Sequence, residues 1–151
     1  MNSKHSYVSE LRFLLLLFLL SVAVNYIWEM LQMPLYEGMP FDTIDSWRMC
    51  LKASIGDGFI ILAIWTIGRI LFGSCQWFAP LSRGRAAVLF VSGIAIAVII
   101  ELHALRTGRW AYSSLMPVLP LIDTGLSPVL QLLILPLISM KAAHFVFTRH
   151  H

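Results

Sequence analysis

The chain has 151 residues, of which 58% are hydrophobic and 13% are charged, and its mean hydropathy is +0.78. A soluble domain carries about 25% charged residues, so this composition excludes an ordinary soluble protein. The net charge of +3 comes without a basic cluster interleaved with aromatic residues, which argues against nucleic acid as a partner.

Four apolar segments follow one another along the chain. Each offers the ~20 residues that an α-helix needs to cross ~30 Å of hydrocarbon. The sequence therefore predicts an all-α polytopic membrane protein, with one transmembrane domain over residues 1–151 and four helices in an antiparallel bundle. The predicted helices cover about residues 11–32, 53–72, 86–105 and 127–147.

The first segment has a second interpretation, as a cleaved signal peptide. Lys4 and Arg12 precede the apolar run Phe13–Leu20, and the Ser-Val-Ala sequence at 21–23 resembles a cleavage site. Against this, apolar residues continue as far as Leu31 and complete a full span. We expect the helix to be retained, whereas cleavage would leave three spans.

The second and fourth segments carry local signals for helix ends. An amphipathic lead-in from Ser46 precedes the second helix. Ser127 is a favoured N-cap residue, and Pro128 takes the first helical position, where a missing N–H costs nothing. Pro136 should kink the fourth helix, and Lys141 should extend its ammonium group to the interface.

The distribution of Lys and Arg predicts the orientation, because cytoplasmic loops carry an excess of both. With both termini in the cytoplasm, the inside holds Lys4, Arg12, Arg69, Arg83, Arg85, Lys141 and Arg149, and the outside holds Arg48, Lys52, Arg106 and Arg109. We therefore predict cytoplasmic termini and a location in the bacterial cytoplasmic (inner) membrane. Arg106 and Arg109 lie on the unfavoured side and need another reason to be there.

The two cysteines lie on opposite sides in this orientation, with Cys50 outside and Cys75 inside. They cannot form a disulfide with each other, and neither has the spacing of metal ligands. The sequence predicts no metal and no cofactor.

Four polar residues fall at one depth of the predicted bundle. Counting ~1.5 Å per residue from the inner ends of the helices places Glu29, Asp57, Glu101 and Gln131 about 21–24 Å from the inner face. That layer lies in the outer half of a ~30 Å hydrocarbon core. It predicts a polar pocket in the outer leaflet.

Helical spacing turns these groups towards the interior of the bundle. Asn25, Glu29 and Gln32, at i, i+4 and i+7, share one face of the first helix. Asp57 lies between two glycines, which let neighbouring helices approach closely. An ionised carboxylate facing lipid costs at least ~2.5 kcal/mol, so all three carboxylates should point inward and lie near one another.

The carboxylates need partners, and His103, Arg106 and Arg109 follow Glu101 closely in sequence. A purely structural role is open for each acid taken alone, for example a structural ion pair between Glu101 and Arg106. Three acids in one layer favour a site. Crowded carboxylates cannot all ionise cheaply, so the layer should hold a transferable proton. The predicted catalytic residues are therefore Glu29, Asp57 and Glu101.

Residues near this layer complete the predicted binding set. Trp47, Trp77 and Trp110 are first of all typical of the membrane interface. Trp28, adjacent to Glu29, and Tyr112 are better placed to contact a ligand. The predicted substrate-binding residues are Asn25, Trp28, Gln32, His103, Arg106, Arg109, Trp110, Tyr112 and Gln131.

One stretch resembles a known family. Glu101, then Thr107-Gly108, Trp110 and Tyr112, followed by prolines, resembles the acid, Thr-Gly, aromatic-x-Tyr stretch of membrane carotenoid-biosynthesis hydratases. The resemblance covers about 20 of the 151 residues. It implies an enzyme that adds water to isoprenoid double bonds, with roles for Glu101, Trp110 and Tyr112. The wider pattern also resembles small bacterial four-helix membrane proteins of uncharacterised function.

The function classes stay open at this stage. In an enzyme, Glu29 or Glu101 would protonate a double bond of an isoprenoid-type lipid and Asp57 would take the proton back, giving hydration, isomerisation or cyclisation. In a small proton- or cation-coupled transporter or a solute-binding protein, the same acids would change protonation during access. A partner subunit is the third alternative. The expected partner is a membrane lipid or lipid-soluble molecule, and a homodimer would help to enclose a transport path.

Overall fold

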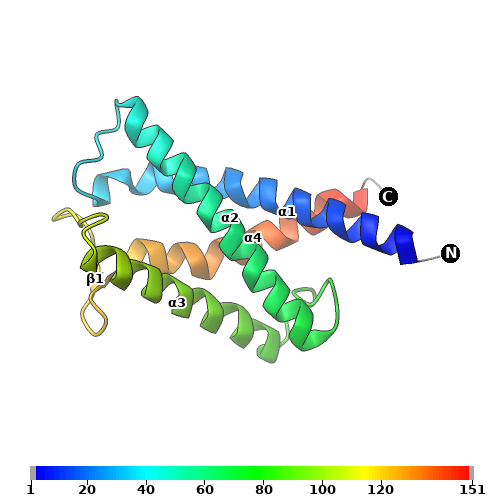
Figure 1. Cartoon of the computed structure of the whole chain (residues 1–151). Coiled ribbons are helices and arrows are strands. Elements are labelled where there is room, and N and C mark those ends of the chain that lie inside the picture. The colour runs from blue at the N-terminus through cyan, green and yellow to red at the C-terminus, as the bar shows by residue number, and fades with distance from the viewer. Residues whose placement is uncertain (1–2, 150–151) are drawn as a thin grey trace.

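Four long helices make up most of the computed structural model, which describes residues 3–149 and side chains from Val8 to Arg149 (Figure 1). They are α1 (Ser3–Gln32), α2 (Ile44–Phe72), α3 (Arg83–Arg106) and α4 (Leu126–Arg149). Each is long and apolar enough to cross a membrane, so the predicted all-α, four-helix membrane architecture is confirmed. Residues 1–2 and 150–151 of the predicted domain, and the side chain of Lys4, lie outside the described part.

Shorter elements join the helices. The 3-10 turn η1 (Met33–Leu35) follows α1, and a two-stranded antiparallel ribbon, β1 (Val118–Leu119) with β2 (Thr124–Gly125), leads into α4. Both connections lie at the end of the bundle opposite the two termini (Figure 1). The backbone N–H of Glu37 donates to the carbonyl of Ala111 (2.9 Å), so the two connections are bonded together.

The helices do not pack equally. α1 packs most extensively against α2 and α4, and α3 packs mainly on α4, whereas α2 and α3 contact each other much less. Figure 1 shows α2 crossing obliquely and diverging from α3 towards the end that carries the connections. The four helices thus leave one seam, between α2 and α3, weakly packed.

Glycines show where helices touch. On α3, a side chain at Gly93 would lie 2.3 Å from the backbone carbonyl of Leu132 in α4. Pro136 has no N–H to bond that same carbonyl, so the close approach of Gly93 meets a carbonyl that the helix leaves free. At Gly56 on α2, by contrast, a side chain would meet nothing within 4 Å. The α3–α4 contact is tight, and α2 leaves open space beside Gly56.

Two predicted helix starts are too late. α1 and α2 begin at Ser3 and Ile44, before the predicted residues 11 and 53. For α2 the reason is local: Thr43 caps the helix by accepting a hydrogen bond from the N–H of Ser46 (3.4 Å). The amphipathic lead-in is therefore the first part of the same helix.

The predicted N-cap at Ser127 is wrong. α4 begins one residue earlier, because the N–H of Leu126 donates to the carbonyl of Pro117 (2.8 Å) and continues the pairing of the ribbon. The hydroxyl of Ser127 is thereby released from capping, and it donates to the Oε1 atom of Gln32 (2.7 Å). Ser127, which was expected to cap α4, instead links α4 to α1 through its side chain.

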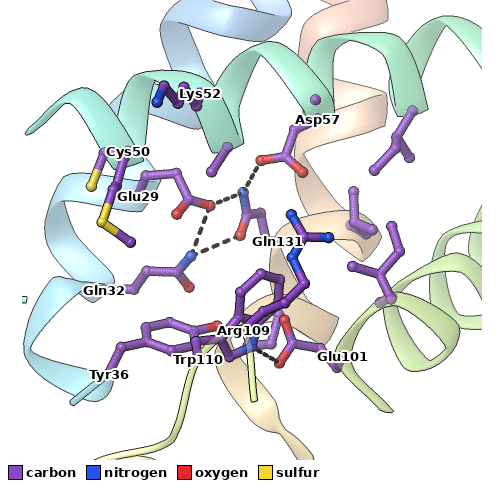
Figure 2. Close-up of a pocket in the computed structure, with 18 of the residues that line it drawn as sticks. Glu29, Gln32, Tyr36, Cys50, Lys52, Asp57, Glu101, Arg109, Trp110 and Gln131 are labelled. Atoms are coloured by element: carbon purple, nitrogen blue, oxygen red, sulfur yellow. Dashed lines mark hydrogen bonds between the residues drawn. The ribbon is translucent and has the colours of Figure 1, made fainter. Parts of the chain in front are cut away.

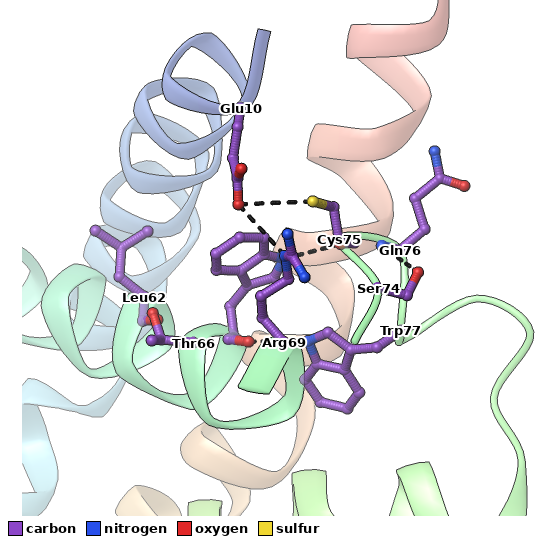
Figure 3. A network of polar contacts seen from close by, with 9 residues as sticks. Glu10, Leu62, Thr66, Arg69, Ser74, Cys75, Gln76 and Trp77 are labelled. Atoms are coloured by element: carbon purple, nitrogen blue, oxygen red, sulfur yellow. Dashed lines mark hydrogen bonds and ion pairs between the residues drawn. The ribbon is translucent and has the colours of Figure 1, made fainter. Parts of the chain in front are cut away.

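The half of the bundle near the termini is filled by a continuous apolar core. Trp77, from the α2–α3 connection, is fully buried, and its Nε1 donates to the carbonyl of Trp65 (2.9 Å). The interface position expected for Trp77 is therefore wrong. Beside it, Glu10 accepts from Arg69 (3.4 Å) and Cys75 (3.6 Å), which fastens this connection to α1 (Figure 3). The core residues are Phe13, Leu17, Ile61, Ile64, Trp65, Trp77, Phe78, Leu89, Met140 and Ala143.

Candidate functional site

A cavity of about 420 Å³ lies at the end that carries the connections, lined by residues of all four helices and both connections. Its size falls in the ~300–1,000 Å³ range of small-molecule sites. Its walls combine polar and apolar side chains (Figure 2). The lining includes Glu29, Gln32, Tyr36, Lys52, Asp57, Glu101, Arg109, Trp110 and Gln131, together with Met39, Met49, Cys50, Ala53, Gly56, Ile60, Ala97, Ile100, Pro128 and Leu132.

The amide of Gln131 is the centre of the polar network. Its Nε2 atom lies 2.9 Å from Oδ1 of Asn25, 2.9 Å from Oε1 of Glu29 and 2.9 Å from Oδ2 of Asp57. The carboxylate oxygens of Glu29 and Asp57 are therefore no further apart than twice that distance. One buried side chain of α4 thus joins acids of α1 and α2 (Figure 2).

A second amide, that of Gln32, extends the network. Its Nε2 atom donates to Glu29 (2.8 Å) and to Oε1 of Gln131 (3.2 Å). Its Oε1 atom accepts from Ser127 and from Nε1 of Trp28 (3.2 Å). Both polar ends of Gln32 are satisfied, so its orientation is fixed by four partners.

The two carboxyl groups also contact each other. Glu29 and Asp57 are side-chain hydrogen-bonding partners, in addition to the bonds that both accept from Nε2 of Gln131. Two carboxyl groups can hydrogen-bond to each other only if one of them carries a proton, because an ionised carboxylate has no donor. The contact therefore indicates a proton held between Glu29 and Asp57.

Glu101 lies in an environment rich in hydrogen-bond donors. Its Oε2 atom accepts from the Tyr112 hydroxyl and from Nε1 of Trp110 (3.2 Å), and Tyr36 is a further hydrogen-bonding partner. The side chain is buried, with 4% of its surface exposed. Neutral aromatic donors thus solvate this carboxylate without a cation.

The connections fix these aromatic donors. Tyr36 and Tyr112 pair as an isolated antiparallel bridge, and the N–H of Gly125 donates to the Tyr112 hydroxyl (2.8 Å). Burial raises the pKa of both Tyr36 and Tyr112, and the nearby charge of Glu101 adds to that effect. Both phenols therefore remain protonated and able to donate.

Most of the predicted site residues come together, but not through ion pairs. Gln32 and Gln131 bond to the Glu29–Asp57 pair, and Asn25 accepts from Gln131. Trp110 and Tyr112 bond to Glu101. Among side chains 8–149, the ion pairs join Arg48 to Asp45 and Arg69 to Glu10. The expectation that His103, Arg106 and Arg109 would pair with the acids is therefore wrong, because amides and aromatic donors take that place.

Of the remaining predicted residues, Arg109 lines the cavity, whereas Trp28, His103 and Arg106 do not. Arg109 lines the cavity, and its guanidinium lies 5.6 Å from the ring centre of Trp110. Trp28 reaches the network only through Gln32 and does not line the cavity. His103 and Arg106 are exposed and lie outside the lining, so the structure does not bring them to the site.

Sequence reasoning missed two lining residues that carry polar groups. Tyr36 follows α1 in an irregular connection, where helical periodicity gives no signal. Lys52 precedes Asp57 by five residues on α2, and it lies just before residue 53, where the second helix is predicted to begin. Within residues 3–149, no group of three or more His, Cys, Asp or Glu side chains could hold a metal ion.

Comparisons of the chain with family models, with curated proteins and with solved structures returned no match. The fold and cavity therefore define the class of this protein: a four-helix integral membrane protein with a polar cavity near one end of the bundle.

Proposed function

We propose that the protein is a membrane enzyme that performs acid–base chemistry on an isoprenoid-type lipid held in this cavity. The observation that carries the proposal is the Glu29–Asp57 pair, two carboxyl groups that share one amide nitrogen and are hydrogen-bonding partners of each other. A carboxylic acid kept in such an apolar-walled site is the group that can protonate a carbon–carbon double bond.

The step balances without a cofactor. The proton shared by Glu29 and Asp57 forms a bond to one alkene carbon, and the π electrons of the alkene supply that bond. The neighbouring carbon becomes a carbocation. Loss of a proton from a neighbouring carbon to the carboxylate pair gives isomerisation. Attack of water gives an oxonium ion, and attack of a second double bond gives a new carbocation; each then loses a proton to the carboxylate pair, which completes hydration or cyclisation.

The opposite wall of the cavity suits the cationic intermediate. Glu101 is satisfied as an anion by its aromatic donors, and the rings of Trp110 and Tyr36 line the same part of the cavity. Aromatic faces attract cations by ~0.5–2 kcal/mol each. Glu101 thus acts as a fixed counter-charge, and proton transfer is assigned to the Glu29–Asp57 pair. This division replaces the interchangeable donor roles of Glu29 and Glu101 in the sequence prediction.

The filled half of the bundle favours an enzyme over a transporter. The apolar core that contains Ile61, Trp77 and Met140 lies between the cavity and the terminal end of the bundle. A solute crossing the membrane would have to displace these fully buried side chains. With both termini in the cytoplasm, the cavity would lie in the outer half of a bacterial inner membrane, open to lipid at the α2–α3 seam.

Deuterium incorporation tests the proposal directly. Protein in lipid nanodiscs is incubated in D₂O with farnesol or longer polyprenols, and the recovered lipid is analysed by mass spectrometry. Protonation by the pair should add deuterium to carbon. Glu29→Gln and Asp57→Asn should each lower the rate by about 100-fold or more, since general acids contribute ~10²–10⁴.

A variant that fills the cavity tests whether the reaction takes place there. Gly56 lines the cavity beside Asp57 with open space before it, so Gly56→Leu should fill the entrance and stop incorporation. Gly84→Leu, also in open space but remote from the lining, is the matched control. Equal incorporation by wild type, Glu29→Gln and protein-free nanodiscs would refute the proposed enzyme.

A further inference from the structure

Two basic side chains line the cavity that the three acids also line. Lys52 comes from α2 and Arg109 from the connection after α3. Figure 2 shows the Arg109 side chain reaching into the cavity, towards the space between Asp57 and Glu101. The cavity therefore presents cations as well as acids, and the reaction proposed above does not use the cations.

Neither cation is committed to an acid of this chain. Among side chains 8–149, Arg48 and Arg69 form the ion pairs, and the contact of Arg109 is with the ring of Trp110. The acids of the cavity are satisfied by amides and aromatic donors instead. Lys52 and Arg109 are both exposed at this surface, so they remain available to a ligand.

Position along α2 gives the depth of Lys52. Lys52 precedes Asp57 by five residues, which places it about 7.5 Å nearer the end of the helix. In a membrane this step leads from the outer hydrocarbon towards the headgroup region. Basic residues at this end also run against the positive-inside tendency if the termini are cytoplasmic, so a specific role would explain them.

We infer that Lys52 and Arg109 bind an anionic headgroup, a phosphate or a carboxylate, carried by the lipid that enters the cavity. This inference rests on the proposed function and specifies its substrate class. Besides the acids and Gln131, the cavity lining includes the apolar side chains of Ile60, Ala97 and Leu132, which fit a hydrocarbon chain and not a free anion. An arginine and a lysine are the common recognition groups for phosphate.

The arrangement also restricts where the lipid reacts. Lys52 and Asp57 are about 7.5 Å apart along the axis of α2, so a lipid whose headgroup is bound at Lys52 presents the isoprene units nearest that headgroup to the proton donor. Reaction occurs in the isoprene units nearest the headgroup and not at the far end of a long chain. This region-selectivity is a property that mass spectrometry of deuterated product can read.

Binding measurements test the headgroup site apart from catalysis. Tritiated farnesyl phosphate is bound to protein in zwitterionic nanodiscs, with farnesol and inorganic phosphate as competitors. Farnesyl phosphate should bind at least tenfold more tightly than farnesol. Lys52→Gln and Arg109→Gln should each weaken its binding about fivefold, the effect of ~1 kcal/mol for each basic residue near a membrane surface, while leaving farnesol binding unchanged.

Arg106→Gln is the matched control, because Arg106 lies at the same end of the molecule but outside the lining. A similar loss with Arg106→Gln, or no preference for farnesyl phosphate over farnesol, overturns the inference. Competition by inorganic phosphate at the same concentration as the lipid overturns it in favour of a free-anion site.

The failure of this inference and the failure of the proposed function can be separated. Glu29→Gln should still bind farnesyl phosphate with the wild-type preference. Selective binding without any deuterium incorporation would preserve the headgroup site and refute acid–base catalysis. Deuterium incorporation that Lys52→Gln and Arg109→Gln leave unchanged would preserve acid–base catalysis and refute the headgroup site.

Discussion

The three acids of the cavity should respond differently when each is replaced by its amide. At Glu29 or Asp57 the change supplies an N–H donor between two carboxyl groups that contact each other. The oxygen bonded to Gln131 can stay in place, and the new amide nitrogen can face the neighbouring carboxylate. Glu29→Gln and Asp57→Asn should therefore leave the free energy of unfolding unchanged or slightly higher.

At Glu101 the same change removes the charge that two donors share. Trp110 and Tyr112 both donate to Oε2, and hydrogen bonds to charged groups contribute about 1.5–3 kcal/mol against about 0.5–1.5 for neutral pairs. Losing about 1 kcal/mol at each of two bonds destabilises Glu101→Gln by about 2 kcal/mol. For a chain of this size, that lowers the melting temperature by about 4–8 °C.

The measurement is unfolding in dodecyl maltoside micelles, by heat and by SDS titration, followed by tryptophan fluorescence and circular dichroism. Gln76→Glu, at an exposed position of the α2–α3 connection, controls for the exchange of amide and acid as such. The reasoning fails if all three amide variants lose equal stability, because the contact between the two carboxyl groups then does not distinguish the Glu29–Asp57 pair from Glu101.

Two further predictions concern packing and orientation. Gly93→Ala should lower the free energy of unfolding by about 1–3 kcal/mol in the same assay, because its methyl group meets the α4 backbone at 2.3 Å. Gly56→Ala should be neutral or stabilising. Equal effects of the two variants would contradict the tight α3–α4 contact. Cys50 is fully buried, so orientation is better tested with Leu121→Cys, at a side chain 97% exposed, in a chain without its two native cysteines. A membrane-impermeant maleimide should label Leu121→Cys in intact cells and Gln76→Cys only after permeabilisation; the opposite result would invert the proposed topology.

Periodicity and depth counting predict the helices and much of the site, because both follow from the fixed rise of an α-helix. Glu29, Asp57 and Gln131 lie in one layer on three helices, and the structure joins them through a single nitrogen. Their spacing along each helix is a local property that the sequence contains. Which of them share a partner depends on how α1, α2 and α4 pack, and the sequence does not encode that in any short pattern.

The predicted partners of the acids were wrong for a related reason. Arg106 and His103 are close to Glu101 in sequence, but they lie on the exposed side of the last turn of α3. Trp110 and Tyr112 reach Glu101 because the chain turns back after Gly108, which has a φ of +64°, and pairs with Tyr36. A loop held by a contact with a distant connection cannot be placed by helical spacing.

The hydrogen bonds explain why one cavity can hold three acids and two bases without internal ion pairs. Had Arg109 paired with Asp57 or Glu101, the pair would be neutral, and both the proton donor and the cation would be lost to a ligand. Amide donors bind Glu29 and Asp57, and aromatic donors bind Glu101, so among side chains 8–149 none of these acids forms an ion pair with Lys52 or Arg109. In the proposed function, the Glu29–Asp57 pair then keeps a proton to transfer, and Lys52 and Arg109 keep their charges for a headgroup. We propose that these neutral donors allow a single small cavity both to bind an anionic lipid and to protonate it.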